Sequence, residues 1–129
     1  MEIPLRAALI AWLAASPSLS ARLNAVSEEA PPRTSLPWLA IAASASTDWS
    51  CKTHPGCEVR VALELHYRGD RPDAAADLVS AIGQRIEQLP REHSRFSVIT
   101  ARFLRARAEQ RGESTRVILL EYHFRLLAE

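Results

Sequence analysis

Residues 58–67 alternate between apolar and mostly polar side chains, and this pattern constrains the fold more than any other part of the chain. Successive side chains of a β-strand point to opposite faces, so the segment predicts a strand with one buried face and one largely solvated face. Half-buried strands of this kind are typical of antiparallel sheets. The apolar members of the pattern are Val59, Val61, Leu63, Leu65 and Tyr67.

Directly after this strand, the apolar spacing changes from strand-like to helical. Pro72 can occupy the first turn of a helix, and Asp73 lies where the helix dipole is positive. Apolar residues then recur at helical spacing until Pro90, which predicts a helix of about 18 residues, roughly 27 Å long, lying across the sheet. Its apolar positions are Ala75, Leu78, Val79, Ile82, Ile86 and Leu89.

The first part of the chain supplies one more helix and one more strand. Residues 3–15 place leucines on one helical face and predict an amphipathic helix that ends at Pro17. Residues 37–44 predict a short apolar strand. The segments 18–36 and 46–56 are polar or rich in proline and predict connecting loops.

The chain is expected to close with a hairpin whose strands span residues 96–108 and 115–127. The predicted order is therefore helix, two strands, helix and two strands. We predict an α+β fold in which a mainly antiparallel sheet packs against the long helix, and the first helix adds cover.

Length and composition favour a single folded domain over residues 1–129. The chain is 47% hydrophobic and 24% charged, which argues against wholesale disorder, and its net charge of +1 gives no general attraction to nucleic acid or membranes. No apolar run approaches the roughly 20 residues that span a bilayer, so we expect a soluble protein. Two cysteines without an export signal favour reduced thiols in a cytoplasm.

Cys51, His54 and Cys57 fall within seven residues and raise the question of a zinc site. A structural zinc ion normally needs four ligands, and only His66 or His93 could supply the fourth. The Cys-x2-His-x2-Cys spacing is not a common paired spacing, and a histidine before proline favours an extended backbone. We expect a polar connection without a metal ion. A zinc-dependent enzyme or a zinc-stabilised binding module built on this loop is the alternative.

No recognisable motif indicates catalysis or cofactor binding. The sequence has no GxSxG, no partner pattern around either cysteine and no glycine-rich loop opening a helix. We therefore expect no catalytic residues, no cofactor and no enzymatic activity. A binding domain for a small ligand or RNA is a second alternative.

The closing hairpin is apolar on both predicted faces. With the turn near Arg111, one side is expected to hold the core, and the other side also carries large apolar residues among charged ones. Exposed apolar residues of this kind do not stabilise a monomer, whereas a subunit interface can bury them. The expected core side consists of Phe96, Val98 and Leu104 with Ile118, Leu120, Tyr122, Phe124 and Leu126, interrupted by Thr100 and Arg102.

Arginines cluster toward the tip of this hairpin, and we favour protein contacts for them. Single-strand nucleic-acid binders interleave aromatic residues with basic ones, yet only Phe103 lies among these arginines. Arginine is also enriched at protein interfaces. The expected subunit or partner interface consists of Ile99, Phe103, Arg105, Arg107, Arg111, Val117 and Leu119.

Nearly the whole chain resembles the DUF3168 family of small tail-completion proteins of long-tailed phages, which includes the tail terminators of phage-like gene transfer agents. The resemblance rests on element order and apolar placement, without a chemical signature, and CKTHPGC has no counterpart in the family pattern. The segments that carry it are RAALIAWLAASPSLSARLN, LPWLAIAAS, EVRVALELHYRG, DAAADLVSAIGQRIEQL and TRVILLEYHFRLLAE.

This resemblance implies a structural virion protein without catalytic residues or metal. The α+β subunit would close into a homo-oligomeric ring, commonly a hexamer, that caps the tail tube and joins it to the head. The implied partners are further copies of the chain, the tail-tube protein and the head connector or stopper protein. DNA would pass through the lumen without sequence-specific binding, and no membrane is involved. The expected location is the bacterial cytoplasm during assembly, and then the head–tail junction of the particle.

Overall fold

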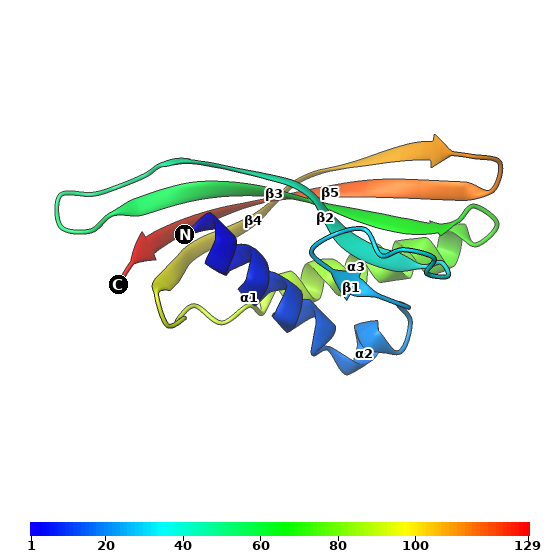
Figure 1. The fold of residues 1–129 in the computed structure, drawn as a ribbon, viewed down its shortest axis with the longest axis horizontal. Coiled ribbons are helices and arrows are strands. Elements are labelled where there is room, and N and C mark those ends of the chain that lie inside the picture. Colours follow the sequence, from blue (N-terminus) through cyan, green and yellow to red (C-terminus); the bar gives the residue numbers. More distant parts are fainter.

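The computed structural model describes residues 1–129 and contains one five-stranded sheet and three helices. Figure 1 shows the helices together on one face of a long, twisted sheet. The predicted α+β class is confirmed. In chain order the elements are α1 (Glu2–Ala14), α2 (Pro17–Ser20), β1 (Val26–Ser27), β2 (Trp38–Asp48), β3 (Gly56–Arg68), α3 (Pro72–Glu87), β4 (Phe96–Arg111) and β5 (Thr115–Ala128).

The strands lie in the order β1-β2-β3-β5-β4. β1 and β2 are parallel, and the other three pairs are antiparallel. β2 and β3 form one hairpin and β4 and β5 form another, and the tips of the two hairpins extend past the helices at opposite ends of the molecule (Figure 1).

The predicted element order omits α2 and β1, which both lie in the segment expected to be a loop. α2 begins at a Ser-Pro pair: the Ser16 hydroxyl accepts a hydrogen bond from the Leu19 backbone N–H at 3.3 Å, and Pro17 takes the first helical position. β1 forms because the Leu39 N–H donates to the Ala25 carbonyl at 3.0 Å. That partner is distant in sequence, so no local pattern indicates the strand.

The core fills the space between the helices and the sheet. Leu5, Leu9 and Leu13 of α1 are fully buried, as the spacing predicted. α3 contributes Leu78, Ile82 and Ile86. This helix ends at Glu87, two residues before the predicted Leu89, because Leu89 precedes Pro90 and is biased away from helical geometry. None of the helices combines the length and apolarity needed to cross a membrane.

Trp12 of α1 and Arg85 of α3 hold the two helices together through reciprocal contacts. The Trp12 indole N–H donates to the Arg85 carbonyl at 2.7 Å, and the Arg85 Nε–H donates to the Trp12 carbonyl at 2.9 Å. The guanidinium carbon also lies 3.4 Å from the centroid of the indole ring. Two hydrogen bonds and a cation–π contact therefore fix one point of the helix–helix interface.

Replacing Arg85 by alanine is expected to lower the free energy of unfolding by about 2 kcal/mol, because a charge-assisted hydrogen bond and a cation–π contact are lost together. Urea unfolding measures the change, with Gln84→Ala, an exposed neighbour on the same helix, as the control. In a double-mutant cycle with Trp12→Phe, we expect a coupling free energy above about 0.5 kcal/mol. Additive effects of the two substitutions would contradict the paired contact.

Candidate functional site

The candidate site lies on β4, the strand at one edge of the sheet. The segment before β4 covers only its beginning, where the Val98 N–H donates to the Arg91 carbonyl at 2.7 Å. From residue 99 onward β4 pairs with β5 on one side and with no strand on the other. A long free edge presents unpaired backbone groups and is a natural template for another chain.

Two irregularities in β4 change which side chains face the helices. The register with β5 shifts between Val98 and Thr100 and again between Phe103 and Arg105, so Ile99 and Leu104 are the extra residues of two β-bulges. Each bulge reverses the alternation of faces that follows it. The sequence shows continuous strand character here, and the prediction of strict alternation missed both bulges.

As a consequence, the predicted faces of β4 are wrong in part. Phe103 pairs in register with Tyr122, whose ring it meets edge-on with centroids 5.5 Å apart, so it lies on the helix side of the sheet. Leu104, expected in the core, is 43% exposed. Thr100 and Arg102, expected to interrupt the core, pair with Arg125 and His123 on the outer face.

Val117 is also unavailable to a partner, because it is fully buried within the subunit. It lies in register with His66 of β3 and Glu109 of β4 on the outer face of the sheet. The Trp38 ring stacks on His66, with centroids 3.7 Å apart. Val117 thus sits in a row of larger side chains that cover it, and the prediction that it forms an interface must be corrected.

The outer face of the sheet is mainly charged, and most of its charges are paired. Arg105 pairs with Glu121, and Glu109 lies 3.0 Å from Arg107 and 3.1 Å from Arg111. Glu58 accepts a hydrogen bond from Arg125 at 2.9 Å, and this bond lowers the pKa of the Glu58 carboxyl. Leu119 and Leu127 are the half-buried apolar residues of this face. The outer face is therefore less apolar than predicted.

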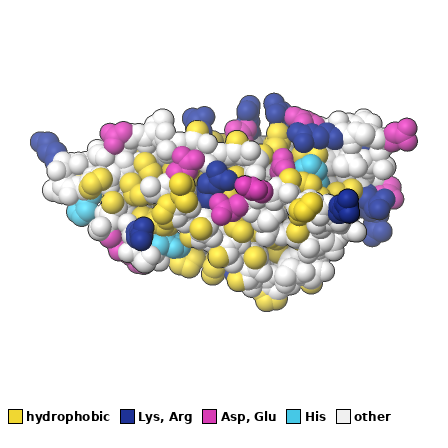
Figure 2. Space-filling model, in the orientation of Figure 1, with side chains coloured by type: hydrophobic (Ala, Val, Ile, Leu, Met, Phe, Trp, Pro, Cys, Tyr) yellow, Lys and Arg dark blue, Asp and Glu magenta, His cyan; other side chains and the backbone are white.

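Exposed apolar side chains gather instead along the free part of β4. Of the four large hydrophobic residues that are exposed, three lie there: Ile99 at 37%, Phe103 at 55% and Leu104 at 43%. We call these residues, with the flanking Arg105 and Arg107, the β4 edge. Figure 2 shows basic side chains along the upper rim of the molecule, where β4 runs in Figure 1. The β4 edge combines apolar anchors, arginines and free backbone groups, as protein interfaces do.

The loop between β2 and β3 does not bring Cys51, His54 and Cys57 together as metal ligands. Cys51 is exposed at the loop, and its Sγ lies 3.5 Å from both Thr53 Oγ1 and the His54 carbonyl. Cys57 belongs to β3, pairs in register with Leu126 and packs against the core. No three His, Cys, Asp or Glu side chains of the chain are placed to hold a metal ion. The two thiols therefore differ in their surroundings, since Cys51 is exposed and Cys57 is half-buried.

The two thiols are expected to react at different pH values. The hydrogen bond with the Thr53 hydroxyl is the main cause that lowers the pKa of Cys51 to about 7, whereas burial raises the pKa of Cys57. Because the thiolate is the reactive form, alkylation of Cys51 by iodoacetamide should reach half its maximal rate near pH 7 and exceed that of Cys57. Mass spectrometry of alkylated peptides measures both rates.

Thr53→Val should move the Cys51 alkylation profile to higher pH, since the hydrogen bond to the thiolate is lost. Thr47→Val, on an exposed position of β2, is the matched control and should leave the profile unchanged. A midpoint above pH 8 in the unaltered protein would contradict the contact with Thr53.

Comparison with known proteins agrees with this fold. A chain in a structure described as "Virion of native gene transfer agent (GTA) particle" superposes with a TM-score of 0.81 at 22% sequence identity, covering 95% of this chain and 94% of that chain. No curated protein sequence matches the chain. The model of the family described as "Tail completion protein gp17" matches residues 7–127. The match spans almost all of the helices and the sheet, and on that basis the chain belongs to the tail completion protein gp17 family.

Proposed function

We propose that the chain is a structural subunit of a long-tailed phage or gene transfer agent that forms a ring, caps the tail tube and joins it to the head connector. The family match over residues 7–127 is the observation that carries this proposal. The likeness to a chain of a gene transfer agent virion supports it. The proposed role is mechanical and requires no catalytic residue, metal or cofactor.

The two edges of the sheet support ring closure. β2 pairs with β3 along one side, and on its other side only Leu39 and Ala40 pair with β1. The rest of that side is free, and β4 is free at the opposite edge of the sheet. Three antiparallel steps separate β2 from β4, so the two strands run in opposite directions. Rotation about an axis parallel to the strands keeps their directions. The β4 edge of one subunit would therefore meet β2 of the next in antiparallel orientation.

A contact between two different edges is heterologous, and such contacts close into rings when the rotation permits. The β4 edge supplies apolar side chains and arginines for this contact, whereas β2 presents small residues at Ala43, Ser44, Ala45 and Ser46. Small residues let another backbone approach closely. We propose six copies, the number that the family resemblance implies, with assembly in the bacterial cytoplasm before the ring joins the particle.

The proposed ring meets the last tail-tube ring on one rim and the head connector or stopper protein on the other, while DNA passes through its lumen. The paired charges on the outer face of the sheet offer phosphate groups few free cations. We therefore expect weak, salt-dependent DNA affinity without sequence preference.

Deletion of this gene in a strain that produces the particle tests the proposed function. Electron microscopy should show heads and tails that fail to join, and tails of abnormal length, because no ring ends tube growth. Expression of the protein from a plasmid should restore joined particles. Joined particles with tails of normal length in the deletion strain would overturn the proposal. Light scattering of the purified protein, alone and with tail tubes, reports ring formation.

A further inference from the structure

A cavity of about 410 Å³ lies between the start of α3, the end of β3 and the segments near α2 and before β2. β5 lies between β3, which lines this cavity, and the β4 edge. Its apolar floor includes Leu36, Pro37, Ala75 and Leu78. The volume falls in the range of pockets that take a small ligand or a short peptide segment.

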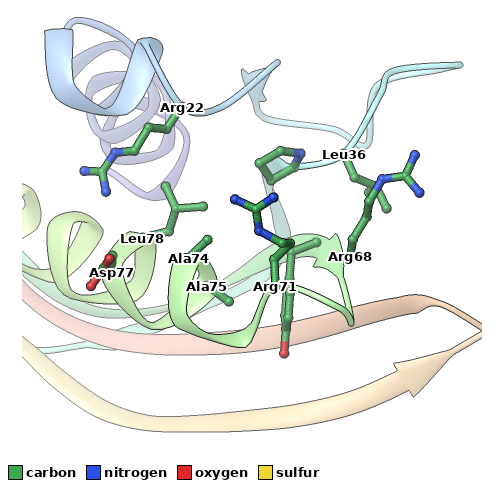
Figure 3. Close-up of a pocket in the computed structure, with 10 residues that line it drawn as sticks. Arg22, Leu36, Arg68, Arg71, Ala74, Ala75, Asp77 and Leu78 are labelled. Carbon is green, nitrogen blue, oxygen red and sulfur yellow. The ribbon is translucent and has the colours of Figure 1, made fainter.

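Three arginines line this cavity, and none has a carboxylate partner within the subunit. Arg22 donates hydrogen bonds only to Ser18, at 3.2 Å to the carbonyl and 2.7 Å to the hydroxyl. Arg68 and Arg71 form no ion pair and no side-chain hydrogen bond, in contrast to the paired arginines of the outer sheet face. Figure 3 shows the guanidinium group of Arg71 rising from the start of α3 into the hollow and that of Arg68 at its far rim. Unpaired cations around an apolar floor favour an anionic ligand with an apolar part.

The positive end of the α3 dipole lies at the Arg71 end, where the carboxylate of Asp73 in the first turn offsets part of it. α3 has 16 residues, and Arg71 at its N-cap position provides no side-chain hydrogen bond to the first turn. Backbone N–H groups of the first turn are therefore free for a ligand, and Ala74 of that turn lines the cavity. Asp77 lies on the next turn of α3, below Arg22 in Figure 3, and lowers the potential at that end. An anion is thus best placed between Arg68, Arg71 and the start of α3.

We propose that this cavity is a docking site for a short acidic peptide segment of another protein, with a carboxylate at Arg71 and an apolar side chain over Leu78 and Pro37. A hollow with an apolar floor fits a side chain, whereas a nucleic-acid backbone needs an extended basic track and gains nothing from Asp77 within the site. The identification of the partner as a neighbouring protein of the particle rests on the proposed function. Binding of an acidic peptide does not depend on it.

Titration of the full chain with an acetylated, amidated peptide of sequence Gly-Leu-Glu-Asp-Glu-Gly tests the site, with backbone amide NMR shifts as the readout. We expect the amide shifts of Ala74, Ala75 and Leu78 to change. A peptide with glutamine and asparagine in place of the acidic residues should leave them unchanged. Arg71→Glu should weaken binding of the acidic peptide by about tenfold or more, because an attraction becomes a repulsion. Arg95→Glu, an equal charge change at an exposed arginine without an ion pair, is the matched control.

The proposal is overturned if the acidic peptide shifts no amide around the cavity, if the neutral peptide shifts the same amides equally, or if an oligothymidylate shifts them instead. It is also overturned if Arg95→Glu weakens the binding as much as Arg71→Glu. The peptide titration needs no particle. Joined particles in the deletion strain would therefore refute the proposed function without affecting the proposed docking site. A failed titration would refute the docking site without affecting the proposed function.

Discussion

Replacing Phe124 by alanine is expected to lower the free energy of unfolding by about 3–5 kcal/mol, the largest effect on stability that we expect from a single side chain. Phe124 is the largest fully buried side chain of the subunit. It lies on β5, between Val59 of β3 and Ala101 of β4 in register. Its loss would leave a cavity where the central strands meet the helices, and the rigid sheet can refill such a cavity only in part.

The matched control is Phe103→Ala on the neighbouring strand. Phe103 is 55% exposed, so the same truncation removes little buried area, and its edge-on contact with Tyr122 is worth about 0.5–1.5 kcal/mol. Urea unfolding followed by circular dichroism compares the two variants. Equal losses for both would show that burial in the sheet does not determine stability here.

The elements that the sequence predicts correctly are those whose pattern is local. β3 shows the strict alternation of a half-buried strand, and α3 shows helical spacing between Pro72 and Pro90, so both were expected within a few residues of their bounds. β1 forms through pairing with a segment more than ten residues away, and no periodicity can indicate it. α2 does carry a local signal, the Ser16 N-cap followed by Pro17, although it has only four residues.

The sequence predicted exposed apolar residues on β4, but it did not predict which face of the sheet each one occupies. Exposed Ile99 and Phe103 agree with the expectation that β4 keeps apolar surface outside the core. The bulges at Ile99 and Leu104 depend on how β4 pairs with β5. The sequence hints at each bulge through two consecutive apolar residues, Val98–Ile99 and Phe103–Leu104, which do not fit strict alternation. The cavity around Arg71 brings together segments distant in sequence, and the sequence pattern did not indicate it.

Replacing Phe103 by arginine is expected to abolish ring assembly while leaving the subunit folded. The substitution places a charge among the exposed apolar residues of the β4 edge, where a partner would have to bury it without a counter-ion. β2, the proposed partner strand, has a single carboxylate, Asp48, at its end. We expect at least a tenfold decrease in joined particles when the variant complements the deletion strain.

The matched control is Ala76→Arg. Ala76 is exposed on α3, outside both β4 and β2, so the same change of an apolar residue to arginine should leave particle yield near that of the unaltered protein. Thermal unfolding of both variants checks the fold, and each should stay folded well above the growth temperature, because neither side chain is part of the core. A normal yield of joined particles with Phe103→Arg would remove the β4 edge from the interface. Equal losses in both variants would point to a nonspecific effect of added charge, since the two positions share only their exposure.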